Sequence, residues 1–112
     1  MLREFLSSND MADACLHLMQ LSETQQAGLL TLDGPPLVNI GCGTDHTIRE
    51  MAEIVAKTVG FTGELRFDVS KPDGTPRKLL DVSRMKKLGW QARTPLEAGL
   101  AEAYADFLKH YA

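Results

Sequence analysis

The sequence has little cysteine, no long hydrophobic run and no strong excess of charge of one sign. Its two cysteines, Cys15 and Cys42, are too few for a disulfide framework, which favours a reducing compartment. No apolar run is long enough for a membrane span, and the N-terminus has no basic segment followed by an apolar stretch and a cleavage site. We therefore expect a cytoplasmic protein.

The charge balance excludes two classes of partner. A net charge of −3 and an isoelectric point near 5.5 argue against nonspecific binding of nucleic acid or of an anionic membrane, since both need basic surface. A hydrophobic content of 44% and a charged content of 24% are typical of a folded globular protein. With 112 residues the chain forms one domain at most, near the lower limit for a self-sufficient core.

Short strands and helices alternate along the chain. We expect helices over residues 9–19, 47–60, 81–88 and 94–108, strands over residues 3–6, 37–40 and 65–69, and a loop over residues 22–36. Thr47 and Glu50 form a capping box for the second helix, Gly60 ends it, and Thr94 caps the last helix. Strands separated by helices favour parallel pairing. The prediction is a mixed α/β fold of about four helices and three short strands, forming a single domain over residues 1–112. So little sheet indicates a part of a larger protein.

Several familiar kinds of site are not supported by the sequence. The turn Gly41-Cys42-Gly43 stands between a strand and a helix, but His46 occupies the place of the third glycine in a dinucleotide fingerprint, so we interpret it as a tight turn. No pair of cysteines or histidines has the spacing of a metal site, and no metal is expected. The residues considered for metal binding are Cys15, His17, Cys42, His46 and His110. Nothing local marks an orienting group for Cys42 and His46, so no catalytic residue is predicted.

The stretch SKPDGTPRKLLD, residues 70–81, allows two interpretations. It combines two prolines, a glycine and five charged side chains in twelve positions. One interpretation is a solvated connection in which proline and glycine fix the backbone angles. In the other, the turn directs Lys71 and Arg77 or Lys78 at phosphate, while Asp73 accepts hydrogen bonds from sugar hydroxyls. Composition alone does not separate the two.

Four segments resemble a known family. They are REFLSSNDMADA, VNIGCGTDHTIREMAEIVAKTVG, FDVSKPDGTPRKLLDVSRMKKLGW and TPLEAGLAEAYADFLK, which together cover nearly the whole chain. They are similar to the C-terminal part of the GDP-L-fucose synthase family, a group of extended short-chain dehydrogenases within the NAD-dependent epimerases and dehydratases. KPDGTPRKLLD is the most specific of these motifs, whereas the others are shared more widely among enzymes that act on nucleotide sugars.

The resemblance implies a function that this chain does not complete alone. Members of the family use NADPH to convert GDP-4-keto-6-deoxymannose to GDP-L-fucose, and an N-terminal Rossmann domain holds the cofactor and a Ser-Tyr-Lys set. The sequence contains neither G-x-x-G-x-x-G after an early strand nor Y-x-x-x-K, so no cofactor binding and no independent activity are expected of it. The implied partners are a GDP-sugar nucleotide and the missing Rossmann domain. The oligomeric state stays open, with a homodimer as one option.

The resemblance also implies three substrate-binding residues. The arginine of the R-E-F-L motif and the aspartate of the K-P-D-G turn contact the nucleotide in the family, and here they are Arg3 and Asp73. Lys71 stands where related enzymes have an arginine, which implies a diphosphate contact. The structural alternatives are a surface arginine at position 3 and a turn-forming aspartate at position 73. Two further functions stay open, namely the corresponding part of another nucleotide-sugar epimerase or dehydratase, and a non-catalytic interaction module derived from one.

Overall fold

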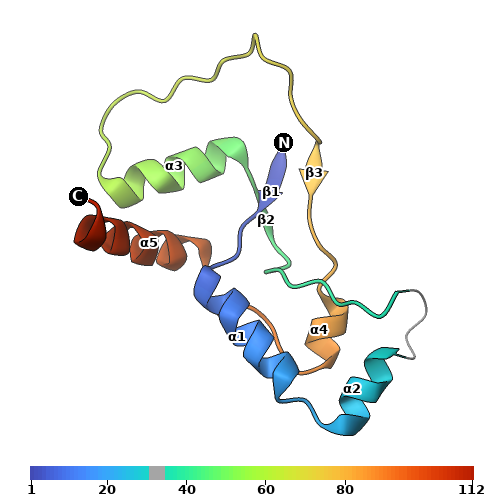
Figure 1. Cartoon of the computed structure of the whole chain (residues 1–112). Helices are drawn as coiled ribbons and strands as arrows, with labels where there is room; N and C mark the ends of the chain where they lie inside the picture. The colour runs from blue at the N-terminus through green and yellow to red at the C-terminus, as the bar shows by residue number, and fades with distance from the viewer. Residues whose placement is uncertain (31–34) are drawn as a thin grey trace.

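The structure is a computed structural model, and it describes residues 1–30 and 35–112. Its elements, in chain order, are β1 (Leu2–Glu4), α1 (Ser8–Met19), α2 (Glu23–Leu30), β2 (Asp45–Thr47), α3 (Ile48–Val59), β3 (Arg77–Lys78), α4 (Ser83–Lys87) and α5 (Leu96–His110). The predicted fold class, mixed α/β with three short strands, is confirmed (Figure 1). The described part of the chain has five helices instead of about four.

The three strands form one small mixed sheet in the order β2-β1-β3. β1 pairs antiparallel with β2 and parallel with β3, so the expectation of parallel pairing is right for one pair only. The strands predicted at 37–40 and 65–69 are wrong, since both segments are irregular. Because β2 and β3 occupy both edges of β1, the central strand offers these segments no partner.

Helix α2 lies where a loop was predicted over residues 22–36. Its start is fixed by reciprocal hydrogen bonds, in which the Gln25 backbone N–H donates to Ser22 Oγ and the Ser22 backbone N–H donates to Gln25 Oε1, each at 3.2 Å. This is a capping box of the S-x-x-Q type, and the glutamines that follow favour helix. The remainder of that prediction falls partly on residues 31–34, which lie outside the described residues.

Helix α3 begins and ends where the sequence predicts. The Glu50 backbone N–H donates to Thr47 Oγ1 at 3.0 Å, which satisfies one of the unpaired N–H groups of the first turn. At the other end Gly60 has a left-handed backbone with φ of 75°, and the Phe61 N–H returns to the Ala56 carbonyl at 2.8 Å. Because Thr47 is also the last residue of β2, this cap joins the sheet directly to the helix.

The core is small and lies between α1 and α4. Ala14, Met85 and Trp90 are buried, and six partly buried side chains pack against them: Leu6, Leu18, Val38, Ile40, Leu88 and Ala92. The Trp90 indole N–H donates to an Asp13 carboxylate oxygen at 2.9 Å, so the ring is held by its polar edge as well as by packing. Residues 38 and 40 therefore contribute to the core although they form no strand.

A second connection joins α1 to the segment before α5. Asp10 is 7% exposed, and its carboxylate accepts hydrogen bonds from the backbone N–H groups of Arg93 and Thr94 and from the Thr94 hydroxyl. The prediction that Thr94 caps α5 is therefore wrong, because its hydroxyl bonds to Asp10 and the N-cap position is Pro95.

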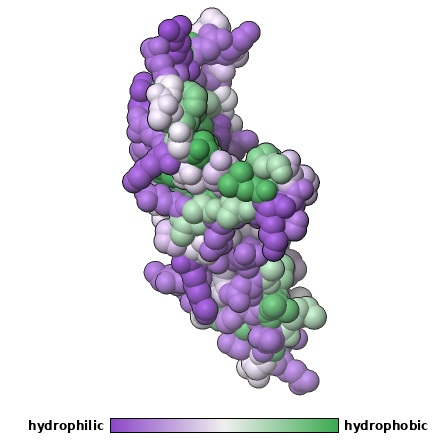
Figure 2. All heavy atoms as spheres, turned by 90° about the vertical axis from the view of Figure 1, so that its left-hand side faces the viewer, coloured by the Kyte–Doolittle hydropathy of each residue, from purple (hydrophilic) through white to green (hydrophobic). Residues whose placement is uncertain are grey.

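The molecule is more extended than a compact domain of its length. Its radius of gyration is 17.5 Å, and its extents are 54 × 36 × 19 Å. A compact domain of this length would have a radius of gyration of about 13 Å. In Figure 1 the segment between α3 and β3 arcs away from the rest of the chain, and Figure 2 shows hydrophobic side chains at the surface. Large apolar side chains such as Leu16, Met19 and Val69 are 60%, 78% and 94% exposed, so much apolar surface is uncovered.

Among the described residues no helix is long and apolar enough to cross a membrane.

Candidate functional site

Arg3 lies in the central strand and reaches the polar turn. Its Nη1 group donates to the Thr75 carbonyl at 2.8 Å and to the Leu2 carbonyl at 2.7 Å. The Leu2 backbone N–H also donates to the Pro76 carbonyl at 2.8 Å, where β3 is about to begin. The structure therefore brings Arg3 together with the turn that carries Asp73, although 72 positions separate Arg3 from Thr75.

The close approach of Arg3 leaves little room for a side chain at position 74. A Cβ atom on Gly74 would lie 3.3 Å from Arg3 Nη2 and 3.6 Å from Met1 Sδ. The Met1 sulfur accepts weakly from Arg3 Nη2 at 3.3 Å and from the Gly74 N–H at 3.1 Å. Within residues 1–30 and 35–112 this thioether is the sole partner on the Nε/Nη2 edge of the guanidinium. That edge is the one suited to a bidentate bond with a phosphate or carboxylate.

Asp73 and Lys71 are exposed at the tip of the same turn. In the part of the chain that the structure describes, neither side chain forms a hydrogen bond or an ion pair. Their backbone neighbours are tied to β1 through Arg3, whereas the two side chains themselves face water. The three predicted substrate residues thus lie on one strand and the turn next to it, and Arg3 alone has fixed contacts.

Arg77 and Lys78 differ in whether their side chains are free to bind a ligand. Arg77 Nε donates to Asp45 Oδ2 at 2.6 Å, and this ion pair crosses from β3 to β2. Lys78 is exposed and is the register partner of Arg3 in the parallel pair. Of the two cations considered with Lys71 in the sequence, Lys78 is therefore the one next to Arg3.

Glu4 holds the other face of β1, and sequence reasoning missed it. Its carboxylate accepts from the Gly43 N–H at 2.6 Å and from the Leu80 N–H at 3.1 Å. A Cβ on Gly41 would lie 2.8 Å from Glu4 Oε2, so a larger residue there would displace the Glu4 carboxylate. Gly43 itself has φ of 78°, as a tight turn requires. Because a carboxylate already occupies the Gly43 N–H, this turn does not have the arrangement of a phosphate-binding loop.

Two aspartates shape the ends of the segment that contains the turn. The hydroxyl and backbone N–H of Ser70 donate to Asp68 and lower the pKa of its carboxyl group. The backbone N–H and hydroxyl of Ser83 lower the pKa of Asp81, with the N–H at 2.9 Å from Asp81 Oδ1. The sequence pattern predicts Asp81 as the N-cap of this helix, but the N-cap of α4 is Val82, which makes no side-chain cap hydrogen bond, so that prediction is wrong by one position. The Asp81 carboxylate nevertheless holds the N–H of Ser83, the first residue of the helix.

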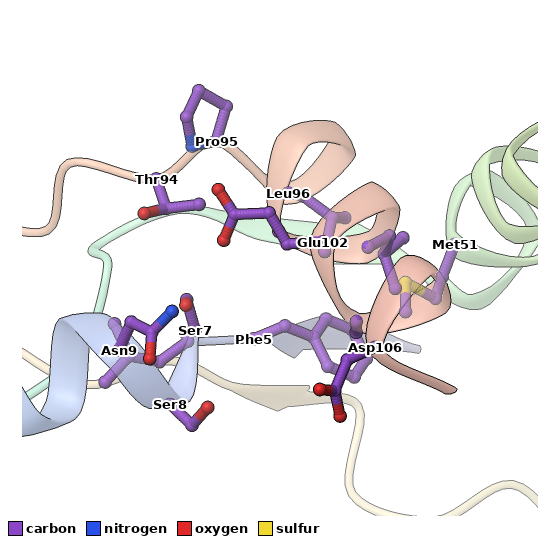
Figure 3. A pocket seen from close by; sticks show the side chains of 14 residues that line it. Phe5, Ser7, Ser8, Asn9, Met51, Thr94, Pro95, Leu96, Glu102 and Asp106 are labelled. Carbon is purple, nitrogen blue, oxygen red and sulfur yellow. The ribbon is translucent and has the colours of Figure 1, made fainter. Parts of the chain in front are cut away.

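A separate cleft of about 710 Å³ lies between α1, α3 and α5. Figure 3 shows Phe5 and Met51 on its apolar side and polar groups such as Asn9, Glu102 and Asp106 around it. No sequence pattern predicts this cleft, because its walls come from segments far apart in the chain. None of the three predicted substrate residues lines it. Among the described residues no group of three or more His, Cys, Asp or Glu side chains is placed to hold a metal ion.

Comparisons with known proteins agree on one group. A scan against protein-family models finds no match. Over 111 residues the chain is 50% identical to a GDP-L-fucose synthase of Escherichia coli K12, which covers 97% of this chain and 34% of that protein. It is 46% identical over 109 residues to GDP-L-fucose synthase 1 of Arabidopsis thaliana, covering 97% of this chain and 31% of the relative.

Solved structures of related enzymes have the same fold over this segment. A GDP-mannoheptose C4 reductase from Campylobacter jejuni with NADP bound superposes with a TM-score of 0.80 at 33% identity, covering 96% of this chain and 32% of that one. A GDP-6-OMe-4-keto-L-xylo-heptose reductase from C. jejuni gives a TM-score of 0.82 at 33% identity, with coverages of 97% and 31%. The chain spans about a third of the length of the curated relatives it matches. The predicted resemblance is confirmed, and the chain is homologous to a part of the GDP-L-fucose synthases, which are extended short-chain dehydrogenases.

Proposed function

We propose that this chain is the GDP-sugar-binding part of an enzyme like GDP-L-fucose synthase, which converts GDP-4-keto-6-deoxymannose to GDP-L-fucose with NADPH. The contact of Arg3 with the turn at residues 74–75 carries the proposal, because it gathers the three residues expected to bind the nucleotide. Arg3 and Lys71 would contact the diphosphate, and Asp73 would accept hydrogen bonds from sugar hydroxyls.

The chemistry of these groups suits a nucleoside diphosphate. The Nε/Nη2 edge of Arg3 offers two parallel N–H donors, while its Nη1 group keeps the side chain anchored to Thr75. Anchoring one end of a long side chain lowers the entropy lost when the other end binds a ligand. Lys71 adds a mobile positive charge, and the unpaired carboxylate of Asp73 adds an acceptor.

The proposal assigns GDP as the nucleotide because the names of the related enzymes agree on it. The E. coli relative is a GDP-L-fucose synthase, a relative from Yersinia pseudotuberculosis is a GDP-L-colitose synthase, and the C. jejuni structures are of GDP-heptose enzymes. The cofactor and the reacting groups would come from segments outside this chain, since the Gly43 N–H already bonds to Glu4. The purified chain alone is therefore expected to consume no NADPH.

The test is a hybrid enzyme. This chain replaces the matching segment of the E. coli synthase, and NADPH consumption is followed with GDP-4-keto-6-deoxymannose as substrate. We expect an active hybrid in which Arg3→Ala and Asp73→Ala each weaken substrate binding by about 1–3 kcal/mol, roughly 5- to 150-fold in KM. Arg66→Ala is the matched control, because Arg66 is exposed and pairs with Glu64 on the same long segment.

The same hybrid separates this function from the alternatives. Inhibition by GDP but not by UDP or dTDP supports the proposal, whereas equal inhibition by UDP or dTDP favours another nucleotide-sugar epimerase or dehydratase. An unchanged KM in both variants would show that Arg3 and Asp73 have structural roles only and do not bind the substrate. An inactive hybrid that binds no GDP in calorimetry would contradict the proposal as a whole.

The exposed apolar surface favours one second candidate, a non-catalytic module that binds another protein or a second copy of this chain. On the first proposal, that surface is covered by the Rossmann domain. Analytical ultracentrifugation of the purified chain distinguishes a homodimer from a monomer. If the chain stays monomeric and captures no protein partner, the interaction module is excluded.

A further inference from the structure

The register of the sheet places three nitrogen-bearing side chains in one row. Arg3 is directly opposite His46 in the antiparallel pair and opposite Lys78 in the parallel pair. Directly paired residues on neighbouring strands project from the same face of a sheet. The strands are about 4.8 Å apart, so the backbone positions of His46, Arg3 and Lys78, here called the cation row, span about 10 Å across the sheet. The Arg3 guanidinium itself reaches along the sheet to Thr75 and Gly74.

The opposite face of the sheet carries the carboxylates. Glu4 and Asp45 form the next register pair, and alternation along the strands places them on the face away from the cation row. The ion pair of Arg77 with Asp45 supports this assignment, because it bridges β3 and β2 across β1 and needs both side chains on one face. The face of the sheet that carries the cation row therefore has no carboxylate from β1, β2 or β3.

His46 also differs from the other two histidines in its partners. His17 Nε2 donates to the Leu88 carbonyl at 2.7 Å, and His110 pairs with Asp106 at 3.3 Å on α5. His46 is half-buried, and within the described residues its ring has no hydrogen-bond partner. Among the described residues no buried side-chain nitrogen or oxygen lacks a partner, so the His46 ring nitrogens are accessible to solvent and open to a ligand.

We propose that His46 binds the phosphate groups of the nucleotide as the third member of the cation row. This inference rests on the proposed function, since it concerns the same ligand. Arg3 supplies the Nε/Nη2 edge, Lys78 supplies a mobile charge from one side, and the His46 ring closes the row from the other. The neutral imidazole still donates one N–H, so this contact does not depend on protonation of the ring. Two linked phosphate groups fit a row of donors better than one does, which selects a diphosphate over a monophosphate.

The three histidines provide the experiment with internal controls. Ring resonances of His17, His46 and His110 are followed by NMR in the purified chain during titration with GDP, with inorganic pyrophosphate and with guanosine. We expect GDP and pyrophosphate to shift the His46 resonances, while guanosine leaves them in place. His17 and His110 are expected to stay unchanged throughout, because both already have partners on other parts of the structure.

Affinities of two variants complete the test. His46→Phe, which removes both ring nitrogens, is expected to weaken GDP binding about threefold to fivefold, the size of one exposed charge-assisted contact, and His110→Phe is expected to have no effect. If GDP shifts the Gly74 amide but not His46, the inference is wrong while the proposed function stands. If GDP and pyrophosphate move no resonance of this chain, the inference also fails, and the activity of the hybrid enzyme then decides on the proposed function separately.

Discussion

Asp10 offers the sharpest stability prediction, because one buried carboxylate joins two distant parts of the chain. It accepts from the Arg93 N–H at 3.2 Å, from the Thr94 N–H at 3.0 Å and from the Thr94 hydroxyl at 3.1 Å. Replacing Asp10 by alanine removes both acceptor oxygens and with them all three hydrogen bonds, and it leaves two backbone donors without partners. The start of α5 would then lose its attachment to α1.

The expected magnitude follows from the kind of bond. A hydrogen bond to a charged group contributes about 1.5–3 kcal/mol, and three that share one carboxylate are not additive. Water reaches part of the vacated space, so we expect Asp10→Ala to lower the free energy of unfolding by about 3 kcal/mol. Because small domains have about 5–15 kcal/mol in total, and this core holds few buried side chains, that loss is a large fraction.

Urea denaturation followed by circular dichroism measures the loss, and hydrogen exchange localises it. The Arg93 and Thr94 amides are expected to lose protection in Asp10→Ala, and Asp10→Asn is expected to fall between the variant and the original protein. Asp106→Ala is the control, since Asp106 is exposed and should change stability by no more than about 0.5 kcal/mol. If Asp10→Ala behaves like the control and both amides stay protected, the reasoning is refuted.

Three further predictions concern the site and its supports. The pKa of Asp81 is lowered from 3.8, first by the hydrogen bond from the backbone N–H of Ser83. The stabilisation of α4 by Asp81 is therefore present above pH 3.8 and is lost as the pH falls through the lower folded pKa. Amide exchange in α4 should accelerate on acidification, and Asp81→Asn should abolish that pH dependence. Glu4→Gln is expected to cost about 1–2 kcal/mol in urea denaturation, because a neutral acceptor replaces a charged one; an unchanged unfolding midpoint would contradict this. Gly74→Ala is expected to weaken GDP binding by displacing Arg3 without removing its charge; equal affinity in calorimetry would show that the close approach is not needed.

Helix α3 could be predicted because its signals are local. Thr47, Glu50 and Gly60 fix its two ends within the helix itself, and the structure reproduces both. Helix α2 had an equally local signal in Ser22 and Gln25, but the surrounding glycine and threonine suggested a loop. The start of a helix can therefore be predicted from the sequence when its capping residues are given more weight than the composition of the segment.

The strands could not be predicted in the same way, because a strand forms only where another segment, often distant in the sequence, pairs with it. Residues 37–40 are apolar enough for a strand, but β1 already has a partner on each side. Residues 65–69 alternate as a strand would, yet they pair with none of the three described strands and stay exposed. The strands that do form, β2 and β3, have polar sequences that no propensity argument selects.

The candidate site was predictable in its members but not in its geometry. Motif resemblance selected Arg3, Lys71 and Asp73, whereas the contact between Arg3 and Thr75 follows only from the pairing of β1 with β3. Glu4 was missed because a carboxylate next to a proposed ligand residue looks like ordinary surface charge. Alternation along a strand was the available signal, since it directs neighbouring side chains to opposite faces.

On the proposed function Arg3 has two roles, which affects how its removal should be interpreted. Its Nη1 group ties the turn to β1, and its Nε/Nη2 edge faces the proposed ligand. A loss of affinity in Arg3→Ala therefore combines a lost ligand contact with a less ordered turn, whereas Asp73→Ala removes a ligand contact alone. Exchange of the Gly74 amide separates the two contributions, because it reports the order of the turn in the absence of any nucleotide.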